Sequence, residues 1–152
     1  MSRKGTAGRV LVIGMAMVVV SCGSANIASS SGPCAWVSAA EASRAIGIRV
    51  LAGYKDPDIS LCTYEFTSRS GVNTDLVVGP VDQKADTFRL EHHQRIVVNG
   101  LGARAVFLRA NSLDDGNSVL IVTDNGKSFL IGSEFLSLDA AKQLGAIVLR
   151  RW

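Results

Sequence analysis

The stretch SVLIVTDNGKSFLI, residues 118–131, indicates the fold class more clearly than any other part of the chain. Two apolar runs, 118–123 and 127–131, flank Asn125 and Gly126. Asn-Gly between apolar runs is the strongest short signal of a β-hairpin, because both central residues of the tight turn need positive φ. The stretch therefore predicts two antiparallel strands.

Other segments have the pattern of strands of the same sheet. Residues 61–67 (LCTYEFT) alternate, which places Cys62, Tyr64 and Phe66 on one face of a half-buried strand. Residues 74–79, 96–98 and 105–108 are also expected to be strands. Together with the hairpin, these segments predict an antiparallel sheet of about five to six strands.

Three segments are expected to be helical. Ser38 and Glu41 form a capping box at the start of an alanine-rich helix, which Gly47 ends. Residues 82–93 show helical spacing, and Ser137 is the expected N-cap of a final helix. The apolar stripe of that helix comprises Leu138, Ala141, Leu144, Ile147, Val148 and Trp152. The chain is expected to form an α+β domain over residues 33–152, with the helices packed on one face of the sheet.

The first 21 residues have the pattern of an export signal. Arg3, Lys4 and Arg9 precede an apolar run of 11 residues, 10–20. As a helix this run would reach roughly 16 Å, about half the thickness of the hydrocarbon layer. It is too short to span a membrane and has the length of a signal-peptide core, so residues 1–21 are predicted to be a signal peptide.

Cys22 ends the stretch VVSC, residues 19–22, which resembles the lipoprotein box of bacteria. The resemblance implies cleavage after Ser21 and a lipid on Cys22, so residues 22–32 become a lipidated cysteine and a short flexible tether. The alternative is an ordinary secretory signal with an incidental cysteine. With the lipid, the chain is expected to be anchored to the extracytoplasmic side of the cell membrane.

The charge balance argues against a nucleic-acid partner. The chain has 16 basic and 13 acidic residues. Three of the basic residues lie in segment 1–21, which contains no acidic residue, so the remaining basic and acidic side chains are equal in number. Nucleic-acid binding would require clustered Lys and Arg.

The cysteine count supports a single disulfide. Once Cys22 is lipidated, Cys34 and Cys62 remain on the outer face of the membrane, where disulfides persist. A metal-binding or redox-active pair is the alternative, but the spacing is wide and no CxxC motif occurs. A structural disulfide between Cys34 and Cys62 is therefore expected.

Residues that could support catalysis or bind a metal are few. His92 and His93 are adjacent, and adjacent helical residues diverge too far to share one ion, so they are expected to be an exposed pair on a helix. The sequence DDGN at 114–117 lacks the ligand spacing of a calcium loop and is expected to form a hairpin loop. Trp36 and Trp152 could be surface anchors, but partial burial is favoured. We expect no catalytic residue, cofactor or metal.

The whole arrangement resembles a family of actinobacterial surface lipoproteins that carry a domain of unknown function. The resemblance rests on the lipid-box cysteine, the motif PCAWVSxxE at 33–41, Gly47 and the motif CTY at 62–64, and on the later stretch 98–102. It implies the Cys34–Cys62 disulfide and a surface location, and it implies no reaction.

Three hypotheses for function follow from these patterns. The first is a non-catalytic, membrane-anchored binding or interaction domain, with an envelope protein as a possible partner. The second is a carrier or sensor of an apolar envelope ligand, which needs a cavity of roughly 300 Å³ or more between sheet and helices. The third is a small envelope hydrolase that uses His92 or His93.

Overall fold

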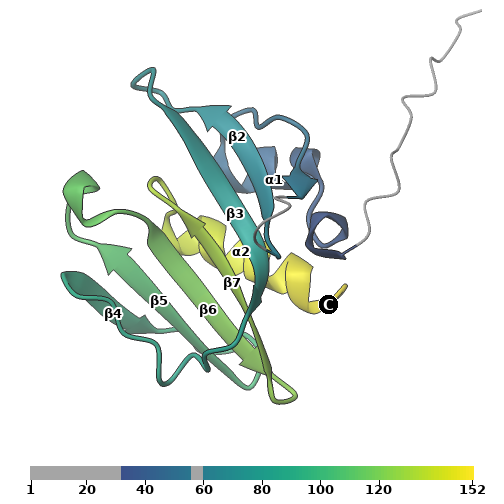
Figure 1. Cartoon of the computed structure of the whole chain (residues 1–152), viewed down its shortest axis with the longest axis vertical. Coiled ribbons are helices and arrows are strands. Elements are labelled where there is room, and N and C mark those ends of the chain that lie inside the picture. Colours follow the sequence, from purple (N-terminus) through teal and green to yellow (C-terminus); the bar gives the residue numbers. More distant parts are fainter. Residues whose placement is uncertain (1–31, 56–59) are drawn as a thin grey trace, which may run out of the picture.

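The computed structural model describes residues 32–55 and 60–152. The predicted signal peptide, Cys22 and most of the tether lie outside the described residues, as does the stretch 56–58, whose Asp-Pro-Asp sequence predicts a turn. The elements in chain order are η1 (Gly32–Ala35), α1 (Ala39–Ile46), β1 (Tyr54–Lys55), β2 (Cys62–Thr67), β3 (Asn73–Val81), β4 (His93–Val97), β5 (Arg104–Ala110), η2 (Leu113–Asp115), β6 (Ser118–Asp124), β7 (Lys127–Ser133) and α2 (Leu138–Leu149). In Figure 1 the helices α1 and α2 lie behind the sheet.

The sheet has seven strands in the order β1-β2-β3-β7-β6-β5-β4, and every neighbouring pair is antiparallel. The antiparallel sheet is confirmed, but the expected five to six strands were too few, so the domain is mostly β. The chain forms a first meander, β1 to β3, and a second, β4 to β7. The last strand of the second meander returns to pair with β3, in a register that runs from Val77 opposite Gly132 to Val81 opposite Ser128.

The Asn-Gly hairpin is confirmed. β6 and β7 pair from Ser118 opposite Ser133 to Asp124 opposite Lys127. Asn125 has a φ of 48° and Gly126 a φ of 78°, which is the left-handed conformation that the tight turn requires.

Both helices that were expected from capping residues are confirmed. The Ser38 side chain accepts a hydrogen bond from the Glu41 N–H, and the Glu41 carboxylate accepts one from the Ser38 N–H at 2.9 Å. Gly47 ends α1 with a φ of 75°. The Ser137 hydroxyl accepts a hydrogen bond from the Ala140 N–H at the start of α2.

The predicted helix at 82–93 is wrong. The segment from Asp82 to His92 forms turns and extended chain, and His93 begins β4. The Ala85 N–H donates to the Thr123 hydroxyl at 2.9 Å, and the Ala85 side chain is 1% exposed. The spacing of Ala85 and Phe88 therefore reflects two contacts with the sheet rather than one face of a helix. The two-residue strand β1 was not predicted either, because the polar composition of residues 53–60 favours a loop.

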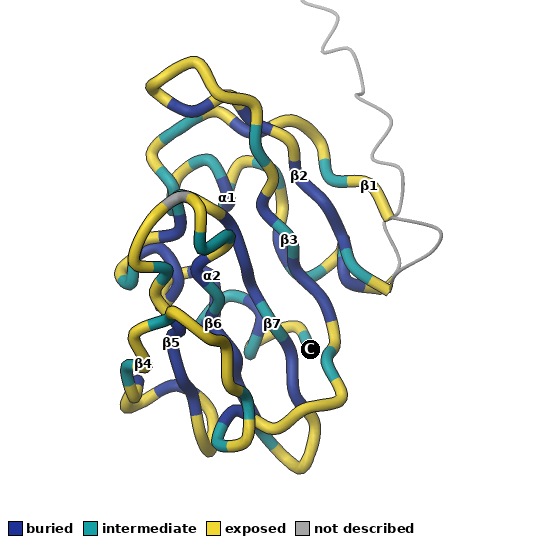
Figure 2. The backbone as a smooth tube through the Cα atoms, turned by 60° about the vertical axis from the view of Figure 1, so that its left-hand side comes forward, coloured by how far each residue is buried: buried dark blue, intermediate teal, exposed yellow. Residues whose placement is uncertain are grey.

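The sheet has a different core on each face. One core lies between the sheet and the helices, and α2 contacts β6, β7 and α1 there. The other core lies on the opposite face, which we call the open face, where Ala85 packs with Val106, Leu108 and Ile121. Figure 2 shows the burial concentrated on the inner strands. Among the described residues, no helix is long and apolar enough to span a membrane.

Three contacts tie the N-terminal part of the domain to the rest. Cys34 is bonded to Cys62, with an S–S distance of 2.00 Å, which confirms the predicted disulfide. Arg151 donates to both carboxylate oxygens of Glu41 at 2.7 Å. Burial raises the pKa of Tyr64 to about 12, so its phenol stays protonated and donates to the Val37 carbonyl.

Replacing both bridged cysteines, C34A with C62A, should lower the free energy of unfolding by about 3–4 kcal/mol, because the unfolded chain regains the freedom of a loop that the disulfide closes. Urea denaturation measures the loss. Reduction of the unaltered protein with a thiol should reproduce it, and an unchanged midpoint in both cases would show that the disulfide adds no stability.

The Glu41–Arg151 ion pair predicts a pH-dependent stability. The hydrogen bond from Arg151 lowers the pKa of Glu41 from 4.5 to about 2. A lowered pKa stabilises the fold above pH 4.5, and this stabilisation is lost as the pH falls from 4.5 to 2. Since the pair is partly exposed, we expect E41Q to cost about 1–2 kcal/mol at pH 6 and almost nothing at pH 2. Denaturation of both proteins at the two pH values tests this, and an equal cost at both would contradict it.

Candidate functional site

The two histidines lie at the start of β4 and not on a helix as expected. His92 is exposed and has a φ of 60°. The His93 ring nitrogens lie 2.9 Å from the Glu91 carbonyl oxygen and 3.0 Å from the Asn117 carbonyl oxygen, so each nitrogen is directed at a backbone carbonyl group. Across the described ranges, no group of three or more His, Cys, Asp or Glu side chains is placed to bind a metal ion.

The expected hairpin loop at 114–117 and the expected partial burial of the two tryptophans are both confirmed. The DDGN stretch lies in the loop that joins the hairpin strands β5 and β6, and the Asp115 carboxylate accepts a hydrogen bond from the Ser112 N–H at 2.9 Å. Trp36 and Trp152 are partly buried and meet edge to face with ring centroids 6.3 Å apart.

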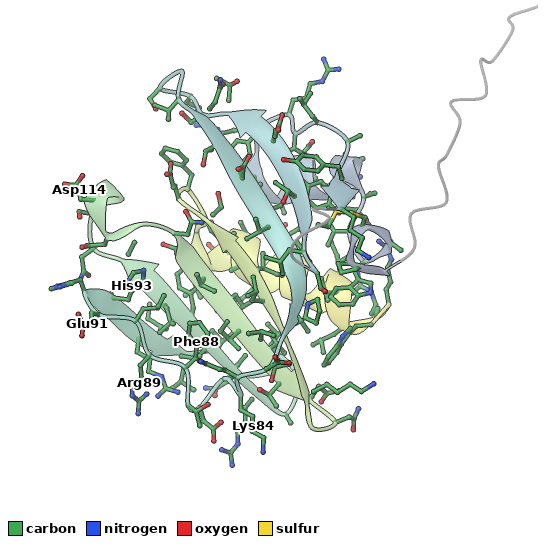
Figure 3. All side chains as sticks on the ribbon, viewed as in Figure 1. Lys84, Phe88, Arg89, Glu91, His93 and Asp114 are labelled. Atoms are coloured by element: carbon green, nitrogen blue, oxygen red, sulfur yellow. A yellow bond between two sulfur atoms is a disulfide. The ribbon has the colours of Figure 1, made fainter. Side chains whose placement is uncertain are left out.

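A small pocket on the open face was not anticipated. It has a volume of about 250 Å³ and lies where the segment before β4 passes over the end of β4 and the start of β5. We call it the β4 pocket; it is lined by Ala85, Asp86, Arg95, 97–100 and 102–106. In Figure 3 the labelled residues of the crossing segment lie in front of the sheet, with Phe88 over the strands and Lys84 and Arg89 directed outward.

The β4 pocket carries a net positive charge. Arg104 forms an ion pair with one carboxylate oxygen of Asp86, while the other oxygen, Oδ1, is buried without a hydrogen-bond partner among the described residues. The Arg95 guanidinium donates to the carbonyl oxygens of Ala85 at 3.2 Å and Asp86 at 3.4 Å. In the described part of the chain, no carboxylate lies within ion-pairing distance of Arg95. The pocket therefore favours an anionic group.

The loop that closes the pocket is held in a fixed shape. Gly100 and Gly102 have φ values of 76° and 62°. Leu101, between them, is 6% exposed and packs into the core beneath the helices. A Cβ at Gly145 would lie 2.7 Å from Leu101 Cδ2, so the glycine at that position of α2 makes room for the leucine. The Ala103 N–H donates to the Asp124 carboxylate at 3.1 Å. These contacts hold both ends of the loop.

β4 lies at one end of the sheet and pairs only with β5 in the described chain. Its last residue, Val97, is 68% exposed, the highest value among the large apolar side chains described. The β4 pocket thus lies beside a free strand edge that carries an exposed apolar side chain.

A second hollow lies at the other end of the molecule. This groove has a volume of about 890 Å³ and lies between the chain that follows α1 and the β2–β3 hairpin. Apolar side chains of Ile48, Leu51 and Phe66 line it beside Arg49, Glu65, Thr67, 73–74 and Asp75. Burial, with the nearby charges of Glu65 and Glu134, raises the pKa of Asp75. The groove is a mixed surface rather than an apolar cavity between sheet and helices.

Sequence reasoning missed the β4 pocket because its wall comes from a distant segment. Arg95 and Val97 share one face of a strand, and that spacing was visible in the sequence. The position of Asp86 beside Arg104 depends on the crossing of segment 82–92, which no local pattern indicated. Comparison with protein-family models, curated proteins and solved structures finds no match to this chain.

The two glycines of the loop predict different costs of substitution. A Cβ at Gly102 would lie 2.9 Å from Val122 Cγ1 and 3.1 Å from the Thr123 carbonyl oxygen, whereas a Cβ at Gly100 meets nothing within 4 Å. G100A should cost about 1 kcal/mol of unfolding free energy for its positive φ, and G102A about 2–3 kcal/mol. Urea denaturation measures both. Equal costs would mean that the loop is free to move away from β6.

Proposed function

We propose that the chain is a lipoprotein, anchored to the extracytoplasmic side of the cell membrane through Cys22, whose domain binds a partner without catalysing a reaction. The Cys34–Cys62 disulfide supports a compartment outside the cytoplasm, because cytosolic thiols are usually kept reduced. The apolar run 10–20 and the VVSC stretch support the anchor. The resemblance to actinobacterial surface lipoproteins points the same way.

The observation that carries the binding role is the β4 pocket beside a free strand edge. An exposed valine on an unpaired strand edge invites pairing with another chain, since natural sheets usually protect their edges. Arg95, which has no carboxylate partner among the described residues, adds a preference for an anionic partner at the same place. His93 supports a binding role rather than hydrolysis, because both of its ring nitrogens are directed at backbone carbonyl oxygens.

A carrier or sensor of an apolar ligand is a second candidate, which the volume of the groove at Ile48 and Leu51 supports. The groove is large enough for a small molecule. However, Arg49, Glu65 and Asp75 line it, and an apolar ligand would cover these charged side chains without pairing them. The β4 pocket is therefore the favoured site.

The anchor can be tested at Cys22. When the full chain is expressed in an actinobacterial host, mass spectrometry of the mature N-terminus should find Cys22 with a diacylglyceryl group. C22A should carry no diacylglyceryl group and should keep residues 1–21, because cleavage at this kind of box depends on the lipidated cysteine, while C34A, which removes a different cysteine, should be lipidated and cleaved like the unaltered chain. An unmodified Cys22 at the N-terminus, or a C22A variant that is still cleaved after Ser21, would contradict the anchor.

A further inference from the structure

We propose that the β4 edge binds an extended, acidic segment of a partner protein, which adds to the sheet as an eighth strand antiparallel to β4. The inference rests on the proposed binding function and names the class of its partner. It depends on three features: the direction of the backbone groups of β4, the side chains on its open face, and the charge of the β4 pocket.

The register of β4 determines which of its backbone groups point outward. The Val98 N–H donates to the Ala105 carbonyl at 3.0 Å, directly across from it. In an antiparallel ladder, the residues whose N–H and C=O groups face the neighbouring strand alternate with residues whose groups face away. The backbone N–H and C=O groups of Gln94 and Ile96 therefore face β5, while those of Arg95 and Val97 point to the free edge. An added strand can pair with both residues.

The side chains then determine the sequence that the edge prefers. Arg95 and Val97 lie opposite Leu108 and Val106, so their side chains are on the open face. Ile96 lies between them and packs against the core beneath the helices. A residue directly opposite another on a paired strand has its Cβ about 4.5–5.5 Å away, on the same face. The edge therefore favours an acidic residue opposite Arg95 and apolar residues opposite Ile96 and Val97.

The charge of the β4 pocket favours the same partner. Asp86 already has a cation in Arg104, whereas the partners of the Arg95 guanidinium among the described residues are two carbonyl oxygens. A carboxylate opposite Arg95 would supply the missing counter-charge beside the pocket. The buried Oδ1 of Asp86 can also accept a hydrogen bond from a donor that enters the pocket. Addition of a strand to a free sheet edge, with pockets that select the side chains, is an established mode of peptide recognition.

The test uses the full chain in detergent and a fluorescent octapeptide of alternating threonine and valine, with two apolar residues followed by one glutamate at its centre, the order that an antiparallel strand needs to place them opposite Val97, Ile96 and Arg95. Replacing that glutamate by glutamine should weaken binding about fivefold, as should R95Q, and the two changes together should add nothing further. R109Q is the matched control, because Arg109 is an exposed arginine on the opposite face of the same strand pair. It should bind the glutamate peptide as the unaltered protein does.

The backbone pairing is tested by methylating the peptide rather than the protein. N-methylation of the glutamate removes an N–H that points toward β4, so it should weaken binding at least tenfold. N-methylation of the next residue removes an N–H that points away and should change binding little. Fluorescence anisotropy measures all of these affinities.

Three results would overturn the inference. Equal affinity for the glutamate and glutamine peptides would show that Arg95 does not pair with the peptide's carboxylate. An equal loss of affinity from the two methylations would show that the peptide does not add to the sheet as a strand. Tight binding of inorganic phosphate or acetate in place of the peptide, lost in R95Q, would make the pocket a site for a small anion. That last result would leave the proposed binding function standing, and the state of Cys22 would be unaffected by any of them.

Discussion

The pairing of β3 with β7 joins the two halves of this molecule, and the rest of the structure depends on it. Each meander forms from neighbouring segments, but only the β3–β7 ladder makes them one sheet. Gly132 permits close packing there, since a Cβ would lie 3.3 Å from Val77 Cγ2. The disulfide and the Glu41–Arg151 ion pair then fasten η1 and α1, which precede the first meander, to β2 and to the chain that follows α2. Pairing between segments so far apart in the sequence forms slowly, because the entropy of closing the loop is lost before the contacts between the strands stabilise the fold.

The same topology creates the candidate site. Because β7 and β6 occupy the middle of the sheet, β4 lies at the far end, and the chain leaving β3 must cross the open face to reach it. The crossing segment is held by Ala85, which packs on Val106 and Ile121 and donates to Thr123. Its passage places Asp86 against Arg104 and leaves Arg95 without a carboxylate. The free edge of β4 and the cationic pocket beside it are thus two consequences of one strand order.

The parts of the fold that the sequence predicted are those encoded by neighbouring residues. Asn125-Gly126 sets its turn by its own φ preferences, and Ser38 with Glu41 begins a helix through contacts three residues apart. Cys34 and Cys62 could be paired because no other cysteine was left. Segment 82–92 was assigned wrongly because Ala85 and Phe88 are spaced as in a helix, while the sheet to which they bind is distant in the sequence. The β4 pocket was missed for the same reason, since its net charge depends on where segment 82–92 crosses the open face of the sheet and places Asp86 beside Arg104.

The account is tested most directly by hydrogen exchange of single amides in β4 with and without the acidic octapeptide. Amides that already face β5 are protected in the free protein, whereas those at the free edge are protected only when a new strand covers them. The account predicts that the peptide slows exchange at Arg95 and Val97 and leaves Gln94 and Ile96 unchanged. Uniform slowing along β4, or no change at Arg95 and Val97, would contradict it.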